Sequence, residues 1–459
     1  MVFNQLNMEK LKYERPVIQK LNTGLMNKFG MTTEYRPMSD IEGIPVTKLI
    51  EDYGSPLFVV SENKIRNKYK EVYTSFSVRY PKVQFAWSYK TNYLNAVCNI
   101  FHQEGSWAEV VSGFEYDKAL LNGVPGEKII FNGPDKSIDE LKKAAEHGSL
   151  IHIDHLDELY SLIDLAKNSN LKPKVAIRVN MDTGVYPMWD RFGLNYENGQ
   201  AWDAINKIMA SKELNLVGLH THIGTFMLSP NAYGVAAGKL VDLAIRTYQK
   251  FDKRIQYIDL GGGFPSQNNL KGAYLPGTDL VPPLDDYAEA IASALLNSPL
   301  SVSELPLLIL ETGRALVDQA GYLLGTVIAN KRLTSGKRAT ILDVGVNLLF
   351  TSFWYNHKVT PAQEFSDYRE DMELFGPLCM NIDVIRENIQ LPTLKKGDHV
   401  VVQNVGAYNM TQWMQFITLR PNIVLIDKDK QPHIIRRSET VDYINSMENM
   451  PEHLKTFSL

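Results

Sequence analysis

Apolar runs typical of β-strands recur from Pro56 to Leu310, and stretches with helical spacing separate them. The predicted strands are residues 56–60, 83–88, 107–111, 128–131, 150–153, 175–179, 216–223, 257–260 and 307–310. Ser137 and Glu140 form a capping box at the start of one intervening helix, and Gly148 ends that helix. About eight such repeats predict an α/β fold with a (β/α)8 barrel. An open doubly wound sheet is the rival arrangement.

The pattern changes after about residue 318. Strand-like runs at 321–329, 339–344, 399–405 and 417–426 follow one another without long helices between them. We therefore predict two domains, a barrel over residues 55–317 and a mainly β C-terminal domain over 318–459. Residues 1–54 carry no barrel repeat and are expected to pack with the β domain. A length of 459 residues also favours two domains over one.

Composition and charge exclude several classes of protein. Hydrophobic residues make up 44% of the chain and charged residues 22%, as in ordinary globular proteins. The net charge of -4 is spread along the chain, which argues against a nucleic-acid-binding face. No apolar run approaches the roughly 20 residues of a membrane span, and the first residues lack the apolar core of a signal peptide. With two cysteines, a reduced, cytoplasmic protein is predicted.

Unusual side chains gather at the carboxyl ends of the predicted strands, where barrel enzymes have their active sites. Lys90 follows one strand, and a lysine there can form an imine with an aldehyde cofactor. Residues 261–263 are all glycine, which lets backbone amides approach a phosphate. His222 can stack on a flat ring, and Glu311 with Arg314 can serve a ring nitrogen and a phosphate. Singly, each has an ordinary structural explanation, such as a solvated lysine, a turn, a core histidine or an ion pair. Together they favour a cofactor site.

The ordered set of motifs resembles one family, the pyridoxal-phosphate decarboxylases that include diaminopimelate decarboxylase and ornithine decarboxylase. The motifs are Tyr89-Lys90-Thr91-Asn92, His222-Ile223-Gly224-Thr225, Gly261-Gly262-Gly263-Phe264, Glu311-Thr312-Gly313-Arg314, Gly376-Pro377-Leu378-Cys379 and Gly406-Ala407-Tyr408. Their order and spacing match the family from about residue 40 to 420. The loop after Asn180 is shorter than in the family, with Met181 where proline is typical.

The resemblance implies an alanine-racemase-like barrel with a β domain, assembled as a homodimer whose active sites lie at the interface. It implies that Lys90 holds pyridoxal 5'-phosphate as a Schiff base, with Glu109 nearby. His222 would stack on the pyridine ring, and Glu311 would keep the ring nitrogen protonated. Cys379, reaching in from the partner subunit, would protonate the carbanion. The groups implied for the phosphate are Thr225, the amides of Gly262 and Gly263, Arg314 and Tyr408. No metal is expected.

The positions that recognise the substrate depart from the best-known members. Met380 follows the cysteine where those members have an acidic residue, and the next acid is Asp383. Thr351 stands where diaminopimelate decarboxylases carry an arginine, whereas Tyr355 matches the end of that segment. Arg314 remains and can also bind a substrate carboxylate. Because a charged substrate end needs buried partners, we predict a decarboxylase for a different or modified diamino or amino acid.

Three alternatives accompany this prediction. The first is a genuine meso-diaminopimelate decarboxylase of lysine biosynthesis. The second is an amino-acid racemase on the same barrel, which would need a second acid–base residue opposite the lysine. The third is a non-catalytic regulatory homologue, for which loss of Lys90, Glu311 or Cys379 would be expected, yet all three are present.

Overall fold

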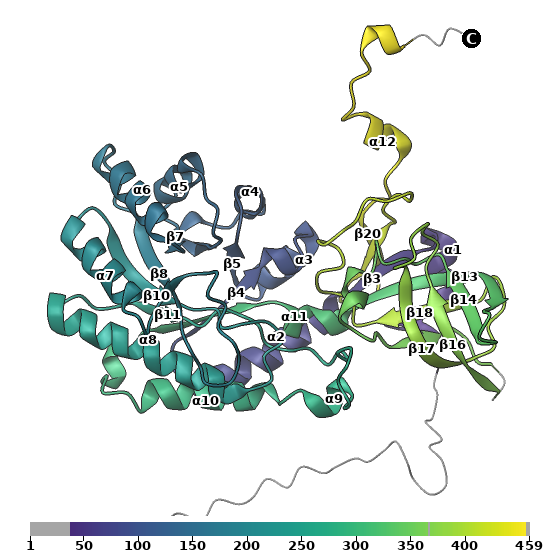
Figure 1. Ribbon diagram of the computed structural model, residues 1–459, viewed down its shortest axis with the longest axis horizontal. Coiled ribbons are helices and arrows are strands. Elements are labelled where there is room, and N and C mark those ends of the chain that lie inside the picture. Colours follow the sequence, from purple (N-terminus) through teal and green to yellow (C-terminus); the bar gives the residue numbers. More distant parts are fainter. Residues whose placement is uncertain (1–36, 366–367, 456–459) are drawn as a thin grey trace, which may run out of the picture. The chain divides into compact units, whose positions relative to one another are not determined.

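The computed structural model describes residues 37–365 and 368–455. A closed barrel begins with the helix at Glu62 and ends with the strand Leu307–Thr312 (Figure 1). The barrel strands are parallel and are β4 (Val83–Ser88), β5 (Trp107–Val110), β6 (Ile129–Phe131), β7 (Leu150–Ile153), β8 (Lys174–Asn180), β10 (Asn215–His220), β11 (Tyr257–Asp259) and β12 (Leu307–Thr312). β12 pairs with β4, and β10 pairs with β8, so the sheet closes on itself. The (β/α)8 prediction is confirmed, and the open-sheet alternative is wrong.

Helices pack around this sheet. The longer ones are α2 (Glu62–Ser77), α3 (Asn95–Gln103), α4 (Gly113–Leu121), α5 (Ile138–Glu146), α6 (Leu156–Lys167), α7 (Gln200–Ser211), α8 (Pro230–Phe251) and α10 (Leu284–Leu296). The predicted capping box opens α5, because the Ser137 hydroxyl accepts from the Glu140 amide and the Glu140 side chain reaches the Ser137 amide. Leu141 and Ala144 form the buried face of that helix, which is the usual amphipathic pattern.

The barrel interior has two layers. The lower layer is apolar and includes Ala86, Trp107, Ile130, Leu150, Ala176, Tyr257 and Ile309. Two residues further along the same strands, the side chains are polar: Ser88, Glu109, Asn132, His152, Arg178, Asp259 and Glu311. Successive strand residues alternate between faces, so residues two apart point the same way. The apolar layer closes the barrel floor, and the polar layer faces its carboxyl-end mouth.

The β domain is built around the long strand β13 (Gly321–Arg332), which pairs with β14 (Arg338–Leu342) and β18 (His399–Gln403). The other strands are β15 (Val359–Pro361), β16 (Arg369–Phe375), β17 (Val384–Pro392), β19 (Ile423–Ile426) and β20 (Pro432–Arg436). Of the predicted run 417–426, only the last four residues form a strand. β16 and β17 were not predicted, because their many charged residues hide the alternation; they pair with each other at the sheet edge.

The first predicted barrel strand forms as β3 (Leu57–Ser61), but it pairs with β13 and β19 of the β domain. The barrel therefore does not begin at residue 55, and α2 at Glu62 is its first element. Before β3 come β1 (Asp40–Ile41), β2 (Ile44–Pro45) and α1 (Val46–Tyr53). They bury Ile41, Val46 and Leu49 in one apolar cluster with strands of the β domain. The expectation for residues 1–36 lies outside the described residues.

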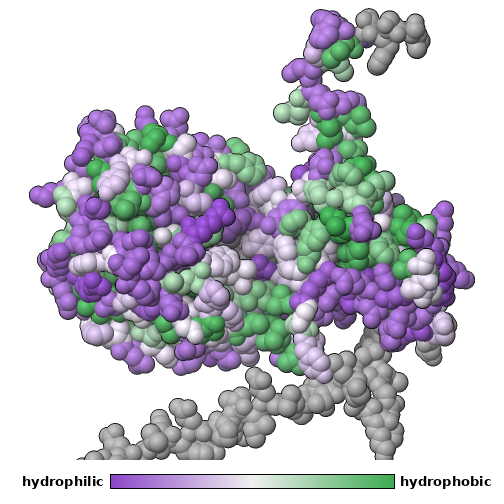
Figure 2. All heavy atoms as spheres, viewed as in Figure 1, coloured by the Kyte–Doolittle hydropathy of each residue, from purple (hydrophilic) through white to green (hydrophobic). Residues whose placement is uncertain are grey.

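The surface in the view of Figure 2 is mostly hydrophilic over the barrel, with hydrophobic residues in small groups. Among residues 37–365 and 368–455, no helix combines the length and the apolar character needed to span a lipid bilayer.

Candidate active site

Lys90 lies just past the end of β4, in the short 3-10 turn η1 (Tyr89–Thr91). Its Nζ donates to Glu109 Oε2 at 2.5 Å, and Glu109 is fully buried at the end of the adjacent strand β5. Burial disfavours the charged ammonium, but the Glu109 and Glu311 carboxylates outweigh burial and raise the pKa of Lys90 above its ordinary value. The amine is therefore held as a cation beside a carboxylate.

Asn132 connects Glu109 to Glu311. Its Nδ2 donates to Glu109 Oε1 at 2.9 Å and to Glu311 Oε1 at 2.5 Å. Neighbouring strands thus present Lys90, two carboxylates and an amide as one continuous set of contacts. Sequence reasoning missed Asn132, although it stands two residues after Ile130 at a strand end, where the rule used for Lys90 would have found it.

Two histidines lie beside Glu311. His220 Nε2 is 3.2 Å from Glu311 Oε1, and the rings of His220 and His152 have centroids 4.6 Å apart. The Tyr257 hydroxyl is 2.9 Å from His152 Nε2. Burial holds the pKa of both histidines well below the ordinary value, so the rings are neutral. His152, His220 and Glu311 offer possible metal-ligand atoms within 4.8 Å of one another, but Glu311 also accepts a hydrogen bond from Asn132. The absence of a metal stays a prediction.

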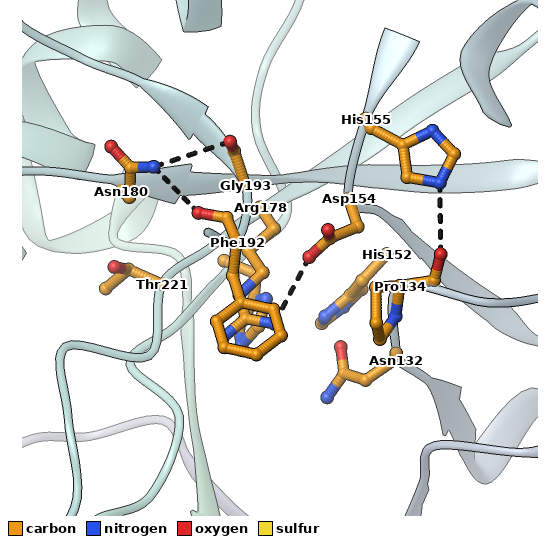
Figure 3. Close-up of polar contacts among 12 residues, drawn as sticks. Asn132, Pro134, His152, Asp154, His155, Arg178, Asn180, Phe192, Gly193 and Thr221 are labelled. Carbon is orange, nitrogen blue, oxygen red and sulfur yellow. Dashed lines mark hydrogen bonds and ion pairs between the residues drawn. The ribbon is translucent and has the colours of Figure 1, made fainter. Parts of the chain in front are cut away.

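His222 follows β10, and burial lowers its pKa to about 3, so its ring is neutral. The Trp189 ring stacks near it, with centroids 5.8 Å apart and planes 16° from parallel. Trp189 belongs to the loop after Asn180. Asn180 Nδ2 holds that loop by donating to the carbonyls of Phe192 at 2.7 Å and Gly193 at 3.4 Å (Figure 3). Trp189 was not predicted, because nothing in a loop sequence shows which way a side chain turns.

Beside the same loop, Arg178 Nη1 donates to Asp154 Oδ1 at 3.2 Å (Figure 3). The Arg178 guanidinium also lies 4.5 Å from the centre of the Phe192 ring. An ion pair from two strand ends and an aromatic contact therefore fix the base of the loop that carries Trp189.

The three glycines pass close to neighbouring backbone. Gly261 and Gly263 have φ of 65° and 86°, which side chains disfavour. A Cβ added to Gly262 would stand 2.3 Å from the Glu311 carbonyl oxygen, and one added to Gly263 would stand 2.1 Å from the Gly224 carbonyl oxygen. Glycine is therefore required here for packing, whatever its amides bind.

Arg314 is the centre of the next group. Its Nη2 donates to Thr225 Oγ1 at 2.8 Å, and its Nη1 donates to the Tyr355 hydroxyl. Its guanidinium lies 4.7 Å from the centre of the Tyr408 ring. Burial opposes the charge, but Tyr408, Tyr355 and Asp318 raise the pKa of Arg314, which stays cationic.

A cavity of about 610 Å3 opens beside Arg314. Its lining is largely aromatic and consists of Trp189, Thr225, Phe226, Leu270, Arg314, Trp354, Tyr355, Tyr408 and Gln412. Of the predicted phosphate groups, Thr225, Arg314 and Tyr408 thus share one cavity wall.

Two of the four tentative substrate residues do not line this cavity. Thr351 is buried elsewhere, with its hydroxyl 2.7 Å from His357 Nε2 and 2.8 Å from Asn409 Oδ1. Met380 and the exposed Cys379 lie in the loop between β16 and β17. Asp383 closes that loop, because its carboxylate accepts from the amides of Val346 and Leu378, each at 2.7 Å. Arg314 and Tyr355 do line the cavity.

These groups fit an aldehyde cofactor with a ring nitrogen and a phosphate. Lys90 offers an amine, Glu311 offers a carboxylate in a dry setting, and His222 offers a flat neutral ring with an unpartnered Nδ1. Thr225 and Arg314 offer donors on the cavity wall. A lysine so equipped at the mouth of a (β/α)8 barrel defines the class of barrel enzymes that use pyridoxal phosphate.

Comparisons with known proteins narrow this class. Residues 62–318 match the family model "Pyridoxal-dependent decarboxylase, pyridoxal binding domain". The diaminopimelate decarboxylase of Methanocaldococcus jannaschii is 30% identical over 90% of this chain and 95% of its own length, and that of Bacillus subtilis is 28% identical over 89% and 94%. The chain belongs to the pyridoxal-dependent decarboxylase family.

Solved structures agree. The M. jannaschii diaminopimelate decarboxylase in complex with L-lysine has a TM-score of 0.82 at 28% identity, covering 90% of this chain and 96% of that one. A lysine/ornithine decarboxylase from Vibrio vulnificus, with a TM-score of 0.70 at 23% identity, shares the fold over 84% of this chain and 98% of its own. The chain is thus a carboxy-lyase with pyridoxal 5'-phosphate as its cofactor, as predicted.

Proposed function

We propose that this decarboxylase works at the barrel mouth, with Lys90, Glu109 and Glu311 as its central groups. The observation that carries the proposal is the unbroken line of hydrogen bonds from Lys90 through Glu109 and Asn132 to Glu311. A solvated lysine has no need of two buried carboxylates and a bridging amide. An amine that must gain and lose protons does need such partners, because they take up and return its proton.

Each of these groups has a distinct task. Bound pyridoxal phosphate supplies an electron-withdrawing ring that takes up the electron pair left by departing carbon dioxide. Glu311 would accept a hydrogen bond from the ring's N–H, and Asn132 keeps that carboxylate oriented. Glu109 would take the proton that Lys90 must lose before its amine can attack an aldehyde. His222, being neutral, offers a stacking face without adding positive charge beside the ring.

The phosphate would lie on the wall that Thr225, Arg314 and Tyr408 share, with the amides of Gly262 and Gly263 nearby. A buried cation and a hydroxyl in hydrogen-bonding contact form a ready-made anion site. Tyr408 has a φ of 65° and its amide donates to the Thr91 carbonyl at 2.8 Å. The backbone of Tyr408 is therefore tied to the lysine turn, and its ring lies against Arg314.

We also propose a cytoplasmic homodimer in which Cys379 serves the partner's site. Cys379 is exposed and is absent from the described lining of this chain's own cavity. A proton donor that cannot serve its own site fits delivery across an interface, and Met380 would arrive with it. Two unpaired cysteines suit a reducing compartment.

For the substrate, the relatives favour meso-diaminopimelate over our main prediction of a different amino acid. The relatives from M. jannaschii and B. subtilis are named diaminopimelate decarboxylases and are matched over nearly their whole length. Arg314 and Tyr355, which line the cavity, are available for a substrate carboxylate.

A second candidate is an amino acid whose distal end is modified, and the cavity wall favours it. Arg314 is the one charged side chain among the described lining residues, and it already bonds Thr225 and Tyr355. The Thr351 hydroxyl is buried and hydrogen-bonded to His357 and Asn409. A free distal ammonium and carboxylate would find few partners on this chain, whereas an acylated end would suit the aromatic wall.

Carbon dioxide release separates the candidates. The purified enzyme would be assayed with meso-diaminopimelate, with L-lysine, and with diamino acids acylated on the distal nitrogen, and Lys90→Ala would serve as the blank. A kcat/KM for diaminopimelate above that of every acylated compound supports the first candidate, and the reverse order supports the second. Release from none of them, by enzyme that carries the cofactor, would contradict both.

A further inference from the structure

Asp318 is a buried carboxylate that takes no part in the chemistry proposed for the site. It begins the 3-10 turn η4 (Asp318–Ala320), one turn after Arg314, and is 1% exposed. Burial raises the pKa of Asp318 to about 6, although the hydrogen bond from Ser266 and the charge of Arg314 both act to lower it. Above that pH it is an anion in the protein interior, which is costly unless several donors satisfy it.

Its donors come from two loops. From the segment after the glycine run, the Ser266 hydroxyl donates at 2.5 Å and Asn268 Nδ2 donates at 2.8 Å, both to Oδ2. From the segment before Tyr408, the Ala407 amide donates to Oδ1 at 3.3 Å. One carboxylate therefore joins a barrel loop to a loop of the β domain.

Two further bonds tighten the junction. The Asp318 carbonyl accepts from the Gly406 amide at 3.1 Å, and Asn268 Nδ2 also donates to the Asn404 carbonyl at 3.0 Å. The second loop needs such restraint, because Asn404 and Tyr408 both have positive φ, at 58° and 65°. Left-handed backbone outside glycine is unfavourable and persists only where its surroundings impose it.

We infer that Asp318 is a positioning residue for the cofactor phosphate, which holds the glycine loop and Tyr408 at a fixed separation around Arg314. It acts through Ser266, Asn268 and Ala407 and does not touch the phosphate itself. This inference rests on the proposed function, because it takes the wall of Thr225, Arg314 and Tyr408 as the phosphate site.

The test compares pyridoxal phosphate with pyridoxal, which lacks the phosphate. Dissociation constants would be measured at pH 8 from the absorbance of the protein-bound cofactor, for the wild type, Asp318→Ala and Asp318→Asn. We expect Asp318→Ala to weaken the binding of pyridoxal phosphate about tenfold, since the three hydrogen bonds to the carboxylate are lost, and to leave the binding of pyridoxal unchanged. Asp318→Asn, which keeps one acceptor oxygen, should fall between.

Asp343→Asn is the matched control. Asp343 also accepts from a serine and a backbone amide, Ser55 Oγ at 2.6 Å and Thr326 N at 2.7 Å, but wholly within the β domain. It should leave both dissociation constants unchanged. If Asp318→Ala fails to fold, Ser266→Ala replaces it, with a loss of about threefold for pyridoxal phosphate alone.

The outcomes are distinguishable. An equal loss for both ligands, or no loss for pyridoxal phosphate, would overturn the role of Asp318. If the wild type binds pyridoxal as tightly as pyridoxal phosphate, the proposal that Thr225, Arg314 and Tyr408 bind the phosphate is contradicted as well.

Discussion

The barrel mouth and the loops of the β domain hold the predicted site residues in different ways. On the barrel side, Lys90, Glu109 and Glu311 end strands whose register is fixed by pairing and by the apolar floor beneath them. On the β-domain side, Thr351, Tyr355 and Met380 lie outside regular strands. The residues proposed for the chemistry thus lie on the rigid part, and the residues predicted to choose the substrate lie on segments that sequence change can alter without disturbing the barrel.

The sharpest test of the barrel side is Lys90→Ala. Removing the amine should abolish the absorbance band of the cofactor bound to Lys90, and borohydride should no longer attach the cofactor covalently. The variant should also lower kcat by at least about 10³-fold. Absorbance spectra before and after borohydride, with carbon dioxide release, provide the measurement. A variant that still turns over at a tenth of the normal rate would remove Lys90 from the centre of the site.

Glu311→Gln should lower kcat by about 10²- to 10³-fold, because glutamine cannot hold the ring nitrogen in its protonated form. Cofactor affinity should change far less, since the phosphate wall is untouched. Ile309→Ala, two residues earlier on the same strand, is the contrasting variant and should cost about 2–5 kcal/mol of folding stability. Kinetics and thermal denaturation of both variants would be compared. Near-normal turnover in Glu311→Gln would contradict the assignment.

On the β-domain side, Met380→Glu restores the acidic residue that follows the cysteine in the best-known members. If the enzyme prefers an acylated substrate, this variant should raise kcat/KM for meso-diaminopimelate about tenfold relative to the acylated compound, as expected for one added charged contact. Thr351 is left unchanged, because it is buried away from the cavity and an arginine there would carry a packing cost. A fall in kcat/KM for diaminopimelate in Met380→Glu would favour the first substrate candidate.

The smallest effect is expected for Trp189→Ala. Its ring stacks against His222 and lines the cavity, and such aromatic contacts contribute about 0.5–1.5 kcal/mol. We expect a rise of a few-fold in KM with kcat nearly unchanged, and recovery in Trp189→Phe. A large fall in kcat would instead place Trp189 with the barrel-side groups.

Much of the barrel side could be predicted because its signals are local and periodic. Lys90, His222, Glu311 and the glycine run follow recognisable strands. Asn132 and His220 also lie at strand ends, but neither belongs to one of the six motifs, so the motifs did not predict them. A strand was predicted at residues 56–60 and forms at 57–61, but it lies in the β domain and not in the barrel. The sequence of an apolar strand does not show which strands it pairs with.

The amino-acid sequence by itself determined the alternation of strands and helices, the ordered motifs and the cofactor, because these depend on residue type and short spacing. Only the tertiary structure decided that Thr351 turns away from the cavity, that Trp189 faces His222, and that Asp318 joins two loops. Such contacts link residues far apart in the chain, and their geometry follows from how whole elements pack, which no local pattern records.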